Sequence, residues 1–249
     1  MNKSILIIND LHIPFHRDDV LSIIKSYHDY GDLNTIIFGG DIIDCKSISS
    51  FPDLDDITIE YEIEVAINFF KKVREIVGDS TKVICIKGNH EVRWERYISK
   101  MHDKALYKFI NPNILEMLRD GMTLYCNGEM KFIEGDPKIE IINNWYVNYE
   151  GIIVCHPTNF YSQSTKNATT AIQFFIDKED FDVLVCAHNH HQSMCYSKGK
   201  WAIESGCCCK SMSYANGKTT ATDQDCGFVY LVMKNGKVMI NDSIIYRLK

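Results

Sequence analysis

The chain has 249 residues, of which 45% are hydrophobic and 24% charged, and this is the makeup of an ordinary globular protein long enough to bury a real core. Its formal net charge is −6. Non-specific affinity for long nucleic acid comes from Lys and Arg, so that partner is not favoured, although bound metal ions would add positive charge that this count omits. No apolar stretch has the length of a signal-peptide core or a membrane span, so we expect a cytoplasmic location and no membrane partner.

Short apolar, β-branched runs alternate with helix-like segments and predict an α/β fold. Five runs are expected to be strands, at residues 5–8, 35–38, 83–86, 151–155 and 183–187. Between the second and third runs, apolar residues recur at near-helical spacing and predict a helix: Ile63, Ile67, Phe70, Val73 and Val77.

The rest of the chain predicts further helices and strands. We expect a helix over residues 168–176, two shorter helices over 103–119 broken at Asn111-Pro112, and a surface hairpin region over 122–148 with turns at Asn127-Gly128 and 135–137. The chain is expected to close in antiparallel strands, at 200–203, 227–233 and 238–246. No repeat or linker interrupts it, so we expect one domain over 1–249 with a helical and hairpin insertion at about 100–150.

Ten cysteines are scattered along the chain, several of them inside apolar runs, as at Cys85 and Cys155. We expect them to be small buried hydrophobes kept reduced. No C-x-x-C pair occurs, so a structural zinc site is not expected. The run Cys207-Cys208-Cys209 is unusual, and it leaves a soft-metal or redox role open.

Each of the five predicted strands is followed within a few residues by side chains able to bind metal: Asp10 and His12, then Asp41, then Asn89 and His90, then His156, then His188 and His190. In open α/β sheets, ligands gather just beyond the carboxyl ends of strands, so one rim would receive them all. Taken singly, a His after a strand is more often structural, and an Asp after Gly-Gly is more often a turn residue. The joint pattern changes this expectation, while three other histidines are expected to be solvated or structural: His16, His28 and His102.

These blocks resemble the calcineurin-like metallophosphoesterase superfamily, whose signatures occur here in order as Asp10-Leu11-His12, Gly40-Asp41-Ile42-Ile43-Asp44, Gly88-Asn89-His90-Glu91, His156 and His188-Asn189-His190. The resemblance implies a β-sandwich of two mixed sheets flanked by helices, with the site at the strand ends. It also implies that Asp10, His12 and His190 hold a first metal. Asn89, His156 and His188 would hold a second one, and Asp41 would bridge the two.

The implied donors are imidazole, carboxylate and amide oxygen without thiolate, and they suit Mn²⁺ first, with Fe, Zn²⁺ or Ni²⁺ as alternatives. Two such ions about 3.5–4 Å apart can clamp both the attacking and the leaving oxygens at phosphorus. The resemblance gives His90 the role of contacting the phosphate and protonating the leaving alkoxide, with Asp44 orienting it. Asp44 as a helix cap or turn residue is an equal alternative.

The block continues as in smaller single-domain bacterial and phage members, Gly-Asn-His-Glu-x-Arg, which places Arg93 one helical turn beyond His90. Its guanidinium could bind a substrate phosphate oxygen, or it could be a surface group paired with Glu91 or Glu95. Where the superfamily's protein Ser/Thr phosphatases have an arginine after the second Asp, this chain has Cys45.

The favoured function is therefore metal-dependent hydrolysis of a small-molecule phosphate ester, with a diester or cyclic nucleotide preferred over a phosphoprotein. A nuclease and a phosphomonoesterase use the same chemistry and remain alternatives. A non-catalytic scaffold is an alternative from another class, because the fold persists in relatives that lost their metals. The complete ligand set and the retained His90 argue against the scaffold.

Overall fold

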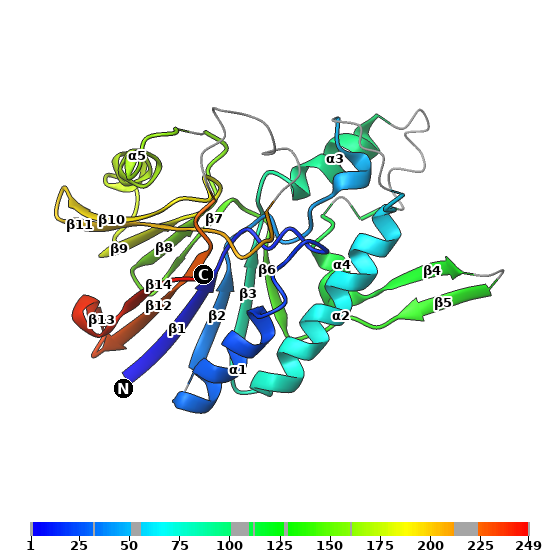
Figure 1. Cartoon of the computed structure of the whole chain (residues 1–249), viewed down its shortest axis with the longest axis horizontal. Coiled ribbons are helices and arrows are strands. Elements are labelled where there is room, and N and C mark those ends of the chain that lie inside the picture. Colours follow the sequence, from blue (N-terminus) through cyan, green and yellow to red (C-terminus); the bar gives the residue numbers. More distant parts are fainter. Residues whose placement is uncertain are drawn as a thin grey trace.

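The predicted strands form two mixed sheets that face each other in a computed structural model (Figure 1). The structure describes residues 2–31, 33–50, 56–100, 110–111, 113–126, 129–159, 161–211 and 224–248. The seven-stranded sheet has the order β13 (Lys237–Val238), β12 (Gly227–Lys234), β1 (Asn2–Ile8), β2 (Leu33–Phe38), β3 (Lys82–Ile86) and β6 (Ile139–Ile142), with β14 (Ile244–Arg247) pairing to β12. The five-stranded sheet has the order β10 (Gln192–Ser197), β11 (Lys200–Ser205), β9 (Val183–Cys186), β8 (Ile152–Cys155) and β7 (Tyr146–Tyr149).

The inner faces of the two sheets make a continuous apolar layer. In β1, Ile5 and Ile7 point into this layer, whereas Leu6 and Ile8 point to the opposite face. The same layer contains Val154 and other apolar residues of β8, β9 and β11. Because side chains alternate along a strand, β1 is buried on both faces and reads as an unbroken apolar run. This confirms the expected sandwich.

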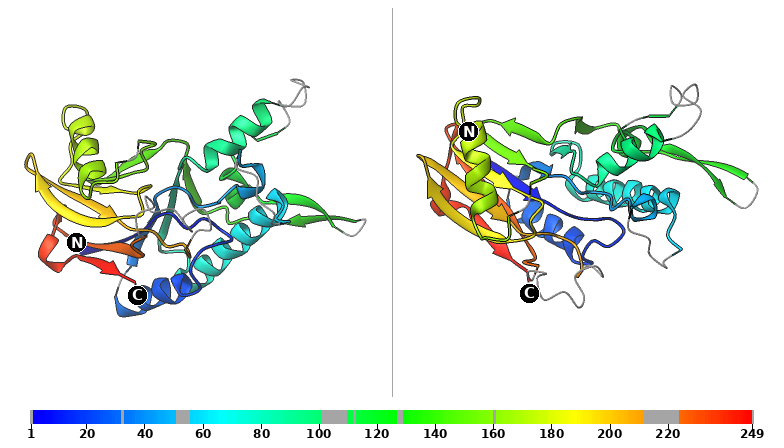
Figure 2. Two further views of the ribbon diagram at one scale, coloured as in Figure 1. Left: turned by 45° about the horizontal axis from the view of Figure 1, so that its top comes forward. Right: turned by 90° about the horizontal axis from the view of Figure 1, so that it is seen from above.

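Helices cover the two outer faces (Figures 1 and 2). Helices α1 (Val20–Tyr30), α2 (Ile59–Val77) and α4 (Glu116–Asp120) pack on the seven-stranded sheet, and α5 (Lys166–Phe175) packs on the five-stranded one. All five apolar positions that predicted α2 are buried. The helix begins after Thr58, whose side chain accepts a hydrogen bond from Tyr61 N, and ends at Gly78. The predicted helix over 168–176 is confirmed as α5.

The surface hairpin is shorter than expected. Strands β4 (Met122–Cys126) and β5 (Glu129–Ile133) form a hairpin that projects away from the sheets (Figure 1). The second half of the predicted region is wrong, because β6 pairs parallel with β3 and β7 pairs antiparallel with β8. Both are edge strands, and a short edge strand has the same local pattern as a hairpin strand. The expected turn at residues 127–128 lies outside the described residues.

Helix α4 lies within the stretch where two helices were expected, and the other predicted helix lies largely outside the described residues. The C-terminal strands are confirmed, although the stretch 238–246 is divided by a short 3-10 turn, η4 (Ile240–Asp242). In the part of the chain that the structure describes, no helix combines the length and apolarity needed to cross a bilayer. The division of the chain into one domain stays a prediction.

Candidate metal centre

The loops that follow β1, β2, β3, β8 and β9 bring the expected ligands together at one edge of the sandwich. The described residues contain three overlapping groups of potential ligand atoms, and within each group all atoms lie within 4.8 Å of one another. The groups are His12, His190 and Cys209; His12, Asp41 and His90; and Asp41, His156 and His188. We call these seven residues the donor strip. His12 and Asp41 each belong to two groups, so the strip is continuous.

Asp41 lies in the middle of the donor strip. Its Oδ2 atom is 3.2 Å from His156 Nε2, 3.7 Å from His90 Nε2 and 3.9 Å from His12 Nε2. Its other oxygen, Oδ1, accepts a hydrogen bond of 2.8 Å from His90 N. One carboxylate oxygen therefore faces imidazoles from both ends of the strip, as a bridging ligand requires.

At one end of the strip, His12 Nε2 and His190 Nε2 are 3.2 Å apart. The Nδ1 atoms of these rings are engaged elsewhere, with Asp44 Oδ1 at 2.7 Å from His12 and Gln224 Nε2 at 2.8 Å from His190. Asp10 Oδ1 lies 3.3 Å from His190 Nε2, yet this fully buried oxygen makes no hydrogen bond. A buried carboxylate oxygen without a partner is costly, and a cation at this position would satisfy it.

At the other end, His156 donates from Nδ1 to Gly39 O at 2.9 Å. This bond directs Nε2 towards Asn89 Oδ1, at 3.1 Å, and towards Asp41. Burial disfavours the charged imidazole, but the Asp41 carboxylate outweighs it and raises the pKa of His156 to about 10. Burial and the neighbouring His156 instead lower the pKa of His188 to about 4. The two imidazoles at this end thus differ in charge preference, with His156 held beside the Asp41 carboxylate and His188 favoured as the neutral ring that a cation would bind.

The backbone of the ligand loops is strained. Five candidate ligands have positive φ: Asp10 at 53°, His12 at 49°, Asp41 at 47°, His188 at 82° and His190 at 55°. A non-glycine residue in this region costs on the order of 1–3 kcal/mol, and such residues cluster at functional sites. The fold therefore maintains several unfavourable conformations to aim these side chains at one place. The orphaned Asp10 oxygen, the strained loops and the donor chemistry together fit a pair of divalent cations.

Within the donor strip, His90 is held by two residues outside the strip, Asp44 and Arg93. His90 Nδ1 is 2.7 Å from Asp44 O and 3.0 Å from Asp44 Oδ1, so the ring presents Nε2 to the strip. Asp44 Oδ1 also contacts His12 Nδ1, and in the structure this carboxylate joins the two imidazoles rather than capping a helix. Arg93 donates from Nη1 to Asp44 O at 3.0 Å, and its Nη2 atom lies 2.8 Å from His90 Nε2, which accepts this bond only when it is unprotonated.

A family model described as calcineurin-like phosphoesterase matches residues 3–192. The chain belongs to this family. No match was found among curated proteins.

Solved structures with similar folds include vacuolar protein sorting 29 from Cryptosporidium parvum, with a TM-score of 0.44 and 13% identity over 99% of this chain and 98% of that one. A second is vacuolar protein sorting 29 from Entamoeba histolytica in complex with Zn²⁺, with a TM-score of 0.42 and 13% identity over 98% of each chain. A third is an archaeal phosphodiesterase, with a TM-score of 0.42 and 12% identity over 98% of this chain and 99% of that one.

The alternative in which Arg93 pairs with Glu91 or Glu95 on the surface is wrong, because both carboxylates have other partners. Glu91 is buried and accepts hydrogen bonds from the backbone N–H groups of Gly88, Asp41, Ile42 and Ile43. Glu95 instead pairs with Lys87. The residue after Asp44, Cys45, is fully buried in the apolar core, so its side chain cannot contact a substrate.

Two residues of this region were given no role by the sequence patterns, Glu91 and Cys209. Glu91 connects the loop after β2, which carries Asp41, to the start of helix α3 (Glu91–Ser99). The one signal for this role in the sequence is its position directly after His90. Cys209 lies in the first donor group, beside His12 and His190, although the ligand set implied by the resemblance contains no thiolate. Its one sequence signal is the cysteine triplet. His16 packs its ring against Phe69, outside the donor groups of the described residues, and His102 lies outside those residues.

Proposed function

We propose that this chain hydrolyses phosphate esters at a centre of two divalent cations, and that it prefers singly charged diesters or cyclic nucleotides. The observation that carries the proposal is the position of Asp41, which belongs to two donor groups, one shared with His12 and the other with His156. Asp10, His12 and His190 would hold one cation, and Asn89, His156 and His188 the other. When bound, the cations would polarise the phosphoryl oxygens and lower the pKa of the attacking water.

His90 would supply the proton for the leaving oxygen. Asp44 holds its Nδ1 atom, so Nε2 faces the reacting groups. Burial disfavours the charged ring, but Asp41 and Asp44 outweigh it and raise the pKa of His90 above its ordinary value. A protonated Nε2 cannot accept from Arg93 Nη2, which lies 2.8 Å away, so on protonation both groups would turn their N–H bonds to an acceptor bound beside them. An anionic phosphate oxygen is the acceptor that this pair of donors suits.

The preference for a diester rests on what is missing around the site. A phosphomonoester dianion presents more charge beyond the two metals, and its best hydrolases add arginine donors around the terminal oxygens. Here Cys45 is buried where an arginine would stand, and Arg93 is the single arginine among the contacts described for His90. One arginine suits a singly charged diester at least as well as a dianion.

The test compares bis-p-nitrophenyl phosphate with p-nitrophenyl phosphate on metal-free protein reloaded with Mn²⁺, Zn²⁺ or Fe²⁺, with a chelator as control. We expect kcat/KM for the diester to equal or exceed that for the monoester. A monoester preference of about tenfold or more, or 1.4 kcal/mol, would overturn the diester assignment. Activity confined to single-stranded DNA would identify a nuclease, and metal-loaded protein without turnover on any ester would identify a scaffold. A cytoplasmic location and a small-molecule substrate belong to the same proposal.

A further inference from the structure

We propose that Cys209 is a thiolate ligand of the cation held by His12 and His190, so that the two positions of the centre prefer different metals. The inference rests on the proposed dinuclear centre and adds a ligand of another chemical type to one of its two positions. Nothing in the family's signature blocks as they occur here contains this residue.

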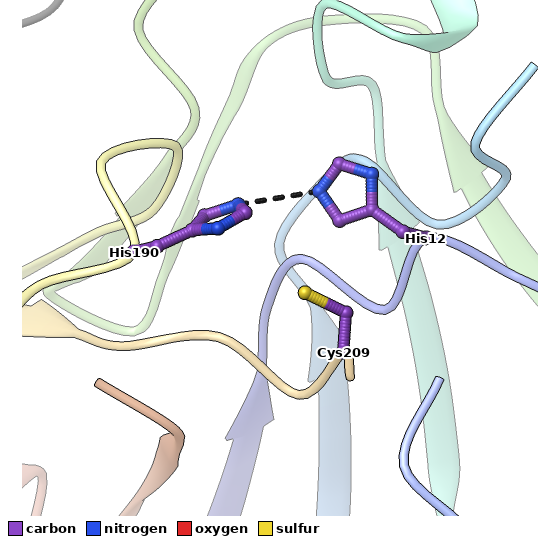
Figure 3. A group of neighbouring side chains, drawn as sticks. All are labelled: His12, His190 and Cys209. Carbon is purple, nitrogen blue, oxygen red and sulfur yellow. Dashed lines mark hydrogen bonds between the residues drawn. The ribbon is translucent and has the colours of Figure 1, made fainter. Parts of the chain in front are cut away.

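The geometry places the thiol among established donors. Ligand atoms of Cys209, His12 and His190 lie within 4.8 Å of one another, and all three residues are buried (Figure 3). The figure shows the thiol pointing towards the space beneath the two imidazoles. Asp10 Oδ1, which makes no hydrogen bond, lies 3.3 Å from the same His190 nitrogen. A cation here would take two imidazoles, the carboxylates of Asp10 and the bridging Asp41, and one thiolate, which makes five donors.

Backbone hydrogen bonds fix the thiol in this place. The loop after β11 runs beside the loop after β1, and Cys208 N donates to Asn9 O at 3.0 Å. Further along, Arg17 N donates to Cys208 O at 3.0 Å and Lys210 N donates to Phe15 O at 2.8 Å. The same segment that carries Asp10 and His12 therefore holds Cys209 on both sides. The two paired backbones therefore fix the Cα atom of Cys209, and one side-chain torsion then sets the place of the thiol.

The two neighbouring thiols have other surroundings. Cys208 donates from Sγ to Gly227 O at 3.2 Å and packs into the core beneath the seven-stranded sheet. Cys207 lies beside the thiols of Cys209 and Cys226 and contacts His190, but it belongs to none of the donor groups among the described residues. Within the triplet, Cys208 is the residue directed away from the centre and Cys209 is the one whose sulfur joins a donor group. Cys208 provides a matched control in the same loop.

Metal binding would exchange the Cys209 S–H bond for a sulfur–metal bond and release the proton to solvent, with no change of oxidation state. Thiolate is a soft ligand that suits Zn²⁺ or Fe²⁺, whereas Mn²⁺ prefers oxygen and imidazole donors. The other position has Asn89, His156, His188 and the bridging Asp41, without a thiol within the donor group there. We therefore expect a soft-metal preference at the Cys209 end only.

The experiment uses the metal-free full chain titrated with Co²⁺ and, separately, with Zn²⁺ and Mn²⁺. The wild-type protein and Cys208→Ala should develop a thiolate-to-cobalt charge-transfer absorption in the near ultraviolet. Cys209→Ala and Cys209→Ser should lose this absorption while still binding cobalt at the other position. Their Zn²⁺ affinity should fall by roughly 10–100-fold or more, since even the loss of a residue that hydrogen-bonds a ligand costs that much, and their Mn²⁺ affinity should change less.

A wild-type protein that binds two Co²⁺ and hydrolyses the diester without that absorption would overturn the inference and leave the proposed function standing. Retention of the absorption by Cys209→Ala would also overturn it. If the variants fail to fold, zinc-edge X-ray absorption of the loaded wild-type protein decides, because a first shell without sulfur excludes Cys209. A wild-type protein that binds no divalent metal and shows no turnover would overturn the proposed function together with the inference.

Discussion

The two ends of the donor strip are built differently, although Asp41 joins them. The end around His156 uses Nδ1 hydrogen-bonded to a backbone carbonyl, Gly39 O, and an amide oxygen from Asn89. The end around His12 uses Nδ1 hydrogen-bonded to a carboxylate, Asp44, and has a buried thiol beside it. A carboxylate partner raises the basicity of a ligating imidazole more than a carbonyl does. If the strip holds two cations as proposed, their two positions would be unequal.

Asp41→Asn should have the largest effect, because the shared carboxylate serves both ends. We expect metal content to fall at both positions and kcat/KM to fall by about 10³-fold or more, since bound metals contribute several kcal/mol of transition-state stabilisation. Elemental analysis of the purified variant beside a kinetic assay measures both. Two metals per chain in this variant would contradict the bridging role of Asp41 and would show that the two metal positions bind independently of it.

His90→Asn should slow turnover by roughly 10²–10⁴-fold while both metals stay bound, because a proton donor is lost and no ligand is. His90 shares a donor group with His12 and Asp41, so metal content is the decisive measurement. If the variant binds fewer than two metals, His90 has to be assigned to the ligands in the middle of the strip.

Arg93→Ala should weaken transition-state binding by roughly 1.5–3 kcal/mol, the value typical of a hydrogen bond to a charged group. Metal content should not change, because Arg93 contacts His90 Nε2 and Asp44 O and belongs to no donor group among the described residues. The matched control is Arg96→Ala on the exposed side of helix α3, which should be silent. Equal kcat/KM for both variants on every active substrate would remove Arg93 from the site.

Asp44→Asn and Asn89→Ala should separate the two ends by affinity. Asp44 contacts His12 Nδ1, so its variant should weaken metal binding at the His12 end by roughly 10–100-fold. Asn89→Ala should weaken the His156 end and leave the His12 end intact. Calorimetric titration resolves the two binding events. Loss of the same event in both variants would show that the two positions are not independent.

Local pattern was enough to predict much of this protein. Runs of apolar residues predicted strands β1, β2, β3, β8 and β9, because strands buried on both faces need apolar side chains at every position. Apolar residues repeating about every 3.6 positions predicted helix α2, because a helix buries one face. The candidate ligands were predicted by their place directly after strands. The end of the hairpin was not predicted correctly. Strand β6 pairs with β3 and strand β7 pairs with β8, and the local sequence of an edge strand does not reveal its partner.

Tertiary structure decided what surrounds those ligands. Asp44 contacts His12 as well as His90 because the loops after β1 and β2 are paired, with Ile13 N donating to Ile42 O at 2.8 Å. Glu91 is a buried acceptor for four backbone donors, which no spacing rule reveals. Cys209 follows His190 by an entire hairpin, β10 and β11, and reaches His12 because its loop pairs with residues near the N-terminus. The position of a residue directly after a strand is enough to predict it as a candidate ligand. Contacts between loops that are distant in the sequence depend on how the two sheets pack.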